Sequence, residues 1–149
     1  MSKDLSANPL LQPSPQPFGV PDFANIRIEH FKPAMFEGMR RQKRNLDAVA
    51  NNPAPATFAN TIIPLEQAER DLEDVACTFF LLAGVNNTPE ITKLKAKMMP
   101  VFSRHGSKQA QREDVFSRVK EVYNNRASLQ PDERRLVEDY YIAATHAGI

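Results

Sequence analysis

A long helical repeat of apolar side chains between residues 57 and 83 constrains the fold more than any other feature of this sequence. Apolar residues recur there at intervals of three and four, which places them on one face of an α-helix opposite a charged face. The apolar positions are Leu65, Ala68, Leu72, Val75, Ala76, Phe79, Phe80 and Leu82. The charged positions are Glu66, Glu69, Arg70, Asp71, Glu73 and Asp74. We therefore expect one long, largely buried helix around which the others pack.

The two ends of this helix carry further signals. Thr57 is suited to be the N-cap, and Asn60 three residues later can complete a capping box. Pro64 has no N–H, so it is expected to kink the helix or to separate a short first turn from the main body. Residues 77–83 are apolar or small nearly all round, which predicts that neighbours enclose this end of the helix.

Two further helices flank this central one in the sequence. The first is expected over residues 31–50, with Pro33 at its first helical position. The other is expected to begin with Thr88 as N-cap and Pro89 at the first helical position. Pro100 is expected to kink this helix near its end.

Residues 106–111 are polar, and we interpret them as a break between helices. A short helix is predicted over 113–124, and a last helix is predicted to start at Pro131. Alternation typical of strands is confined to a few residues around 26–28. The predicted fold class is therefore all-α, with about five antiparallel helices joined by short loops.

Residues 1–22 are predicted to form an extended arm, and residues 23–149 a helical domain. The arm is rich in proline, which excludes α-helix and central strand. Its apolar side chains indicate packing against its own domain or a neighbouring one, although a ligand for an aromatic-lined groove is an alternative. The prolines of the arm are Pro9, Pro13, Pro15, Pro17 and Pro21.

Composition sets limits on the class of protein. The 149 residues suit one domain, and a net charge of +1 argues against nucleic acid as a partner. The sequence has no apolar run long enough for a membrane span and no signal-peptide core near its start, so we expect a cytoplasmic protein without a membrane partner. The one cysteine, Cys77, is expected to be an inert core residue.

A search for catalytic chemistry finds no site in the sequence. His30, His105 and His146 have no partner at metal-ligand spacing, and the His-Glu-x-x-His pattern is absent. We expect His30 to stabilise a helix entry and the other two histidines to suit helix C-terminal ends.

Charged clusters are interpreted as solvated helix faces. The carboxylates beside Arg70 on the central helix and the basic run of the second helix, which has Glu37 and Asp47 nearby, both fit this reading better than paired acids or a phosphate site. The basic run comprises Arg40, Arg41, Lys43 and Arg44. No catalytic, cofactor-binding or metal-binding residue is therefore predicted in this chain.

Three stretches together resemble a known enzyme family. They read NPLLQPSPQPFGVPDFANIRIEHFKPAMFEGM from Asn8, NNPAPATFANTIIPLE from Asn51 and RRLVEDYYIAATHAG from Arg134. The chain is similar to the N-terminal region of zinc metallopeptidases related to thimet oligopeptidase. Within that family the likeness is greatest to bacterial peptidyl-dipeptidase (dipeptidyl carboxypeptidase), with oligopeptidase A second.

The resemblance implies a helical enzyme whose two lobes enclose a channel for short peptides. Its zinc, the zinc ligands and the catalytic glutamate belong to the C-terminal part of such enzymes, so no catalytic or metal residue carries over onto this chain. The chain is then expected to be a partial N-terminal domain that forms one wall of the channel and is inactive alone. Its partners would be the C-terminal catalytic region and, in the full enzyme, short peptides.

A standalone helical module that binds a peptide or a partner protein is the alternative. The fragment hypothesis predicts an exposed apolar surface where the rest of the enzyme docks. The module hypothesis predicts that the chain's own core accounts for its apolar residues.

Overall fold

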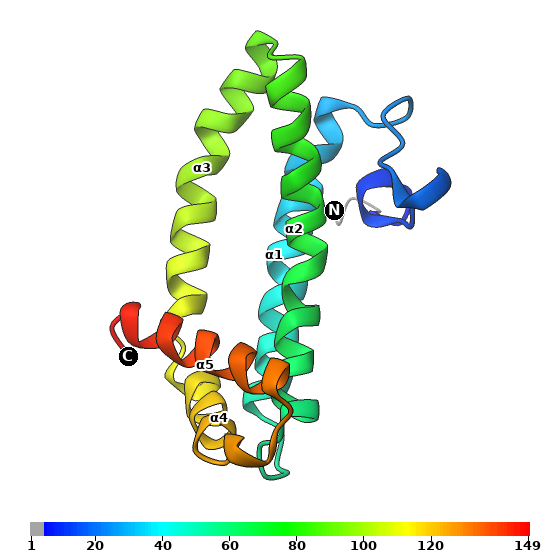
Figure 1. Cartoon of the computed structure of the whole chain (residues 1–149). Helices are drawn as coiled ribbons and strands as arrows, with labels where there is room; N and C mark the ends of the chain where they lie inside the picture. Colours follow the sequence, from blue (N-terminus) through cyan, green and yellow to red (C-terminus); the bar gives the residue numbers. More distant parts are fainter. Residues whose placement is uncertain (1–4) are drawn as a thin grey trace. The chain divides into compact units, whose positions relative to one another are not determined.

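The computed structural model describes residues 5–149, and these fold into α-helices, short helical turns and loops (Figure 1). The predicted all-α class is confirmed, because the described residues contain no strand, including those around 26–28. The helices are α1 (Ile28–Ala50), α2 (Ile63–Val85), α3 (Pro89–Ala110), α4 (Glu113–Asn124) and α5 (Pro131–His146). A π-helical turn, η3 (Phe58–Ile62), precedes α2 directly.

The chain divides into two compact units. The first unit contains the residues up to Gln42 together with Glu69–Phe102, and the second contains Lys43–Ala68 and Ser103–Ile149. Each unit has its own hydrophobic core. The boundary expected between residues 22 and 23 stays a prediction.

The core of the first unit is built from the N-terminal part of α1 and parts of α2 and α3. The rings of Phe31 and Phe79 meet edge to face, with their centroids 5.2 Å apart. Gly38 of α1 is buried against Leu72 of α2. The buried residues of this core are Phe31, Ala34, Met35, Met39, Val75, Phe79, Ile91 and Met98.

The N-terminal arm packs partly onto this core, as the sequence predicts. Leu10 and Leu11 contact the core, and the Asn8 side-chain amide donates a hydrogen bond to the backbone oxygen of His30. The path of the arm is not extended throughout, because single 3₁₀ turns form at Pro9–Leu11 and Pro17–Gly19. Phe18 lies fully exposed in the second turn.

The core of the second unit surrounds α4. Arg118 is buried there, and its guanidinium donates to the backbone oxygens of Asn52 and Ala54, which ties the loop before η3 to α4. Tyr123 and Tyr141 stack with their centroids 4.0 Å apart. The buried apolar residues are Leu46, Val49, Ala56, Ile62, Leu65, Ala68, Val119, Val122 and Val137.

The helix starts marked by polar caps are confirmed. Thr57 and Asn60 form the predicted capping box, and the turn that follows is separate from the body of α2, as expected from Pro64. The Thr88 hydroxyl accepts from the backbone N–H of Ile91 at 3.3 Å. The predicted bounds of α4 and the predicted start of α5 also agree with the structure.

Two other helix ends are wrong in the prediction. Helix α1 begins at Ile28, so Pro33 lies inside the helix instead of at its first position. Pro33 is the sixth residue of α1, so the helix lacks the hydrogen bond that an N–H at this position would donate to the backbone oxygen of Glu29. Helix α3 continues to Ala110, so the polar break expected over 106–111 is helical, and Gly106 is tolerated inside an exposed helix at modest cost.

Candidate functional site

The last turns of α2 expose an uncharged surface, which we call the apolar face and define as Cys77, Phe80, Leu81, Gly84 and Val85. Phe80 is 39% exposed, Leu81 53% and Val85 76%, and Cys77 is an exposed free thiol. Two predictions are therefore wrong: neighbours do not enclose this end of the helix among the described residues, and Cys77 is not a core residue.

The geometry of the helix explains the apolar face. Val75 and Phe79 point into the core of the first unit, where Phe31 of α1 meets the Phe79 ring. Successive residues of an α-helix are rotated by about 100° about its axis, so the residues of the apolar face point in other directions than Val75 and Phe79. Met99 of α3 is also exposed, whereas its neighbour Met98 is buried.

The exposed side of α2 changes character along its length. Its first half carries the charged residues predicted to form a solvated face, and these are exposed: Glu66, Glu69, Arg70, Glu73 and Asp74. From Cys77 to Val85 the sequence has no charged residue. Exposed apolar side chains that lie together are a feature of surfaces that contact a partner.

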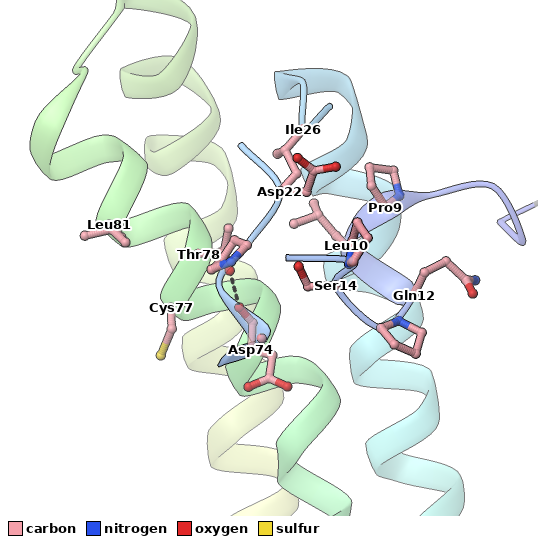
Figure 2. A pocket seen from close by; sticks show the side chains of 14 residues that line it. Pro9, Leu10, Gln12, Ser14, Asp22, Ile26, Asp74, Cys77, Thr78 and Leu81 are labelled. Carbon is pink, nitrogen blue, oxygen red and sulfur yellow. Dashed lines mark hydrogen bonds between the residues drawn. The ribbon is translucent and has the colours of Figure 1, made fainter. Parts of the chain in front are cut away.

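A cavity of about 560 Å³ lies beside the apolar face, between α2 and the N-terminal arm (Figure 2). The arm contributes mainly prolines, together with Leu10, Ser14 and Asp22, and α2 contributes Thr78 and Leu81. In Figure 2 the side chains of Cys77 and Leu81 point away from those of Pro9 and Gln12. Cys77 and Leu81 belong both to the apolar face and to the lining of the cavity.

The chemistry of this cavity suits binding better than catalysis. Asp22 accepts hydrogen bonds from the side chains of Gln16 and Asn25, and the Thr78 hydroxyl donates to the backbone oxygen of Asp74. Among the described residues that line the cavity there is no histidine, lysine or arginine. No local sequence pattern predicts this cavity, because it depends on where the arm lies against α2.

An ionic network joins α1 to α2 within the first unit. Both Arg40 and Arg41 donate to the buried carboxylate of Glu37, and Arg41 also pairs with Asp71 at 2.9 Å. The hydrogen bond from Arg40 is the largest influence that lowers the pKa of Glu37; burial opposes it and Arg41 adds to it. In the second unit Lys43 pairs with Asp47 at 2.7 Å. The predicted pairing of the basic run with Glu37 and Asp47 is confirmed.

The three histidines lie on three different helices. His30 stabilises the start of α1 as expected, because its Nδ1 accepts a hydrogen bond from the backbone N–H of Arg27 at 3.0 Å. His146 lies in the last turn of α5. His105 is different: α3 continues beyond it to Ala110, so the predicted place at a helix C-terminal end is wrong. Burial lowers the pKa of His105, and the charge of Lys108 lowers it further.

The described residues contain neither a metal-binding cluster nor a membrane-spanning helix. Between residues 5 and 149, no three His, Cys, Asp or Glu side chains gather closely enough to hold a metal ion. The described donor set therefore does not fit zinc, which needs three or four such ligands. None of the described helices is long and apolar enough to cross a bilayer.

Comparison with known proteins relates the chain to bacterial peptidases. Dipeptidyl carboxypeptidase of Salmonella typhimurium is 31% identical over 132 residues, which cover 89% of this chain and 19% of that protein. The Escherichia coli dipeptidyl carboxypeptidase is 32% identical over 133 residues, covering 88% of this chain and 20% of that protein. Oligopeptidase A of Escherichia coli is 25% identical over 134 residues, covering 89% and 19% respectively.

No protein-family model matches the chain. The chain spans about a fifth of the length of the curated relatives that it matches. The resemblance predicted from the sequence, to dipeptidyl carboxypeptidase first and oligopeptidase A second, is thereby confirmed over nearly nine-tenths of this chain.

Proposed function

We propose that this chain forms the N-terminal part of the helical wall that encloses the substrate channel in a peptidyl-dipeptidase or oligopeptidase-type zinc metallopeptidase acting on short peptides. The match to dipeptidyl carboxypeptidases carries this proposal, because it covers most of this chain and only about a fifth of each relative. In the proposed role the chain shapes the space that a peptide enters and does no chemistry on the peptide bond.

In this proposal the chain is inactive alone, because peptide hydrolysis by this enzyme class needs a set of zinc ligands that the described residues do not bring together. In this enzyme class zinc would polarise the scissile carbonyl and activate water. The described donors do not fit a zinc ion, so the proposal assigns the metal and the catalytic glutamate to the C-terminal region of the enzyme. That region is the proposed partner, and the cytoplasm is the proposed location.

The exposed apolar face supports this role over a standalone module. A module with no large partner is expected to cover its apolar residues with its own core, whereas Leu81 and Val85 are more than half exposed. The cavity between the arm and α2 favours the alternative, a helical module that binds a short peptide, because apolar walls with a few polar groups are typical of such sites.

Hydrolysis of a short blocked peptide tests the proposal. The purified chain would be assayed with added zinc, alone and mixed with the remaining C-terminal portion of the Escherichia coli dipeptidyl carboxypeptidase. Activity only in the mixture is the expected result. Activity of the chain alone would show that catalytic residues lie within it and would overturn the proposal. If neither sample is active while the chain binds the peptide, the module alternative holds.

A further inference from the structure

We infer that the apolar face of α2 is the docking surface for the part of a dipeptidyl carboxypeptidase that this chain does not match, and that it receives an apolar helix from that part. This inference rests on the proposed function. It adds the surface and the kind of partner segment that the surface fits.

The matched relatives identify the occupant. At most 17 of the 149 residues lie outside the 132-residue match, so a continuous match includes the whole of the apolar face. The same match leaves about four-fifths of the relative without a counterpart in this chain. This unmatched portion of the relative is the partner that we infer for the apolar face.

The chemistry of the face fits a helix. Cys77, Leu81 and Val85 are spaced by four residues, which places them side by side on successive turns. Phe80 lies four residues before Gly84 on the neighbouring side of the helix. A Cβ at Gly84 would meet no atom within 4 Å, so the backbone there is open to close approach. Residues 77–85 carry no charged side chain, so an apolar helix on Leu81 and Val85 would meet apolar side chains there. The Lys95 ammonium of α3 lies 6.0 Å from the centroid of the Phe80 ring, so a partner that covers Phe80 must leave this charge in water or pair it.

The cavity extends the same surface. Its lining includes Cys77 and Leu81, so a helix on the apolar face would lie along the edge of the space between α2 and the arm. The exposed charged residues of α2 end at Asp74. One of them, Asp71, is paired with Arg41 of α1 and is not part of the apolar face. The docking surface is thus confined to the last turns of α2.

Binding of the remaining portion of the Escherichia coli enzyme would test the inference. The chain, with an affinity tag, would be co-expressed with that portion and the co-purified amount measured. Leu81→Lys is expected to lower recovery at least about tenfold, because it places a charge in the interface. The matched control is Ile142→Lys on α5, where the wild-type side chain is 49% exposed against 53% for Leu81, and its recovery is expected to stay within about twofold.

Cys77 gives a second readout that needs no substitution. In the free chain the thiol is exposed, so reaction with a thiol reagent is expected to slow at least about tenfold in the complex. Equal recovery of both lysine variants with an unprotected Cys77 would overturn the docking surface and leave the proposed function standing. No recovery of the wild-type chain would overturn both.

Self-association is the remaining outcome. Size-exclusion chromatography with light scattering would measure the mass of the chain alone. A dimer that Leu81→Lys dissociates, and that does not bind the remaining portion, would show that a second copy occupies the face and would overturn the inference.

Discussion

Gly38 of α1 lies directly against Leu72 of α2, so that a Cβ added at Gly38 would come within 3.0 Å of the Leu72 Cα. Because the opposing atom belongs to the backbone, Gly38→Ala requires α1 and α2 to shift apart by a few tenths of an ångström at this position. Overpacking of this kind typically costs about 1–3 kcal/mol and exceeds the gain of about 0.5–1 kcal/mol from replacing a helical glycine. A lower midpoint of urea unfolding is expected.

The matched control for this substitution is Gly106→Ala on α3. A Cβ at Gly106 would meet no atom within 4 Å, so only the helix-propensity gain of about 0.5–1 kcal/mol remains. The control is expected to raise the midpoint. A Gly38→Ala midpoint as high as that of the control would show that α1 and α2 are not packed closely at this position.

Arg118 is expected to be essential for the loop before η3. Its Nη1 donates to the backbone oxygens of Asn52 at 2.8 Å and Ala54 at 3.0 Å. Arg118→Met would leave these oxygens without that donor, which typically costs about 1–3 kcal/mol. We expect a lower urea midpoint and faster proteolysis within residues 51–56. Lys120→Met, which alters an exposed residue of the same helix, should leave both measurements close to wild type.

Acid is expected to destabilise the chain in part through Glu37. Its pKa lies below the ordinary value of 4.5, chiefly because of the hydrogen bond from Arg40. A carboxyl whose pKa is lower in the folded state stabilises the fold fully above the unfolded pKa, and this contribution is lost as the pH falls through the folded pKa. The unfolding free energy of the wild type should therefore decrease as the pH drops below 4.5.

Glu37→Gln removes this titration. The variant is expected to be less stable at neutral pH and to lose less further stability below pH 4.5 than the wild type does. Urea unfolding at a series of pH values would measure the difference, with Glu73→Gln on the exposed side of α2 as the control. A variant curve parallel to that of the wild type would contradict the assigned role of Glu37.

The exposure of Cys77 can be measured directly in the folded chain. Its reaction with a thiol reagent is expected to be within about tenfold of the rate in urea, because solvent reaches the thiol. The comparison is a Cys77→Ser, Val75→Cys double variant, since the Val75 side chain is buried in the core of the first unit. That thiol should react only after unfolding. Equal protection of both thiols would show that Cys77 is covered.

The helix starts that carry a polar cap could be predicted because their signals are local. Thr57 with Asn60 and Thr88 with Pro89 satisfy or remove backbone N–H groups within a single turn, so no distant contact is needed to identify them. The ends that failed depend on residues whose effect is ambiguous. A glycine such as Gly106 can end a helix or lie inside one, and the surrounding structure determines which of the two occurs.

The exposure of Cys77 could not be predicted, for a different reason. Apolar periodicity shows which residues avoid water, but it does not show which chain covers them. Phe79 is covered by Phe31 of the same chain, whereas Leu81 is not covered by any described residue to the same extent. The cavity likewise depends on the path of the proline-rich arm, which no local pattern specifies.

The π-helical turn before α2 makes this start sensitive to a change of length. The backbone N–H of Ile63 donates to the oxygen of Phe58, five residues earlier, so the turn contains one residue more than an α-helical turn. Deleting one residue there would rotate the capping box about 100° relative to Leu65 and Ala68, which face the core. Insertions and deletions within 58–62 should therefore be rare among homologous sequences.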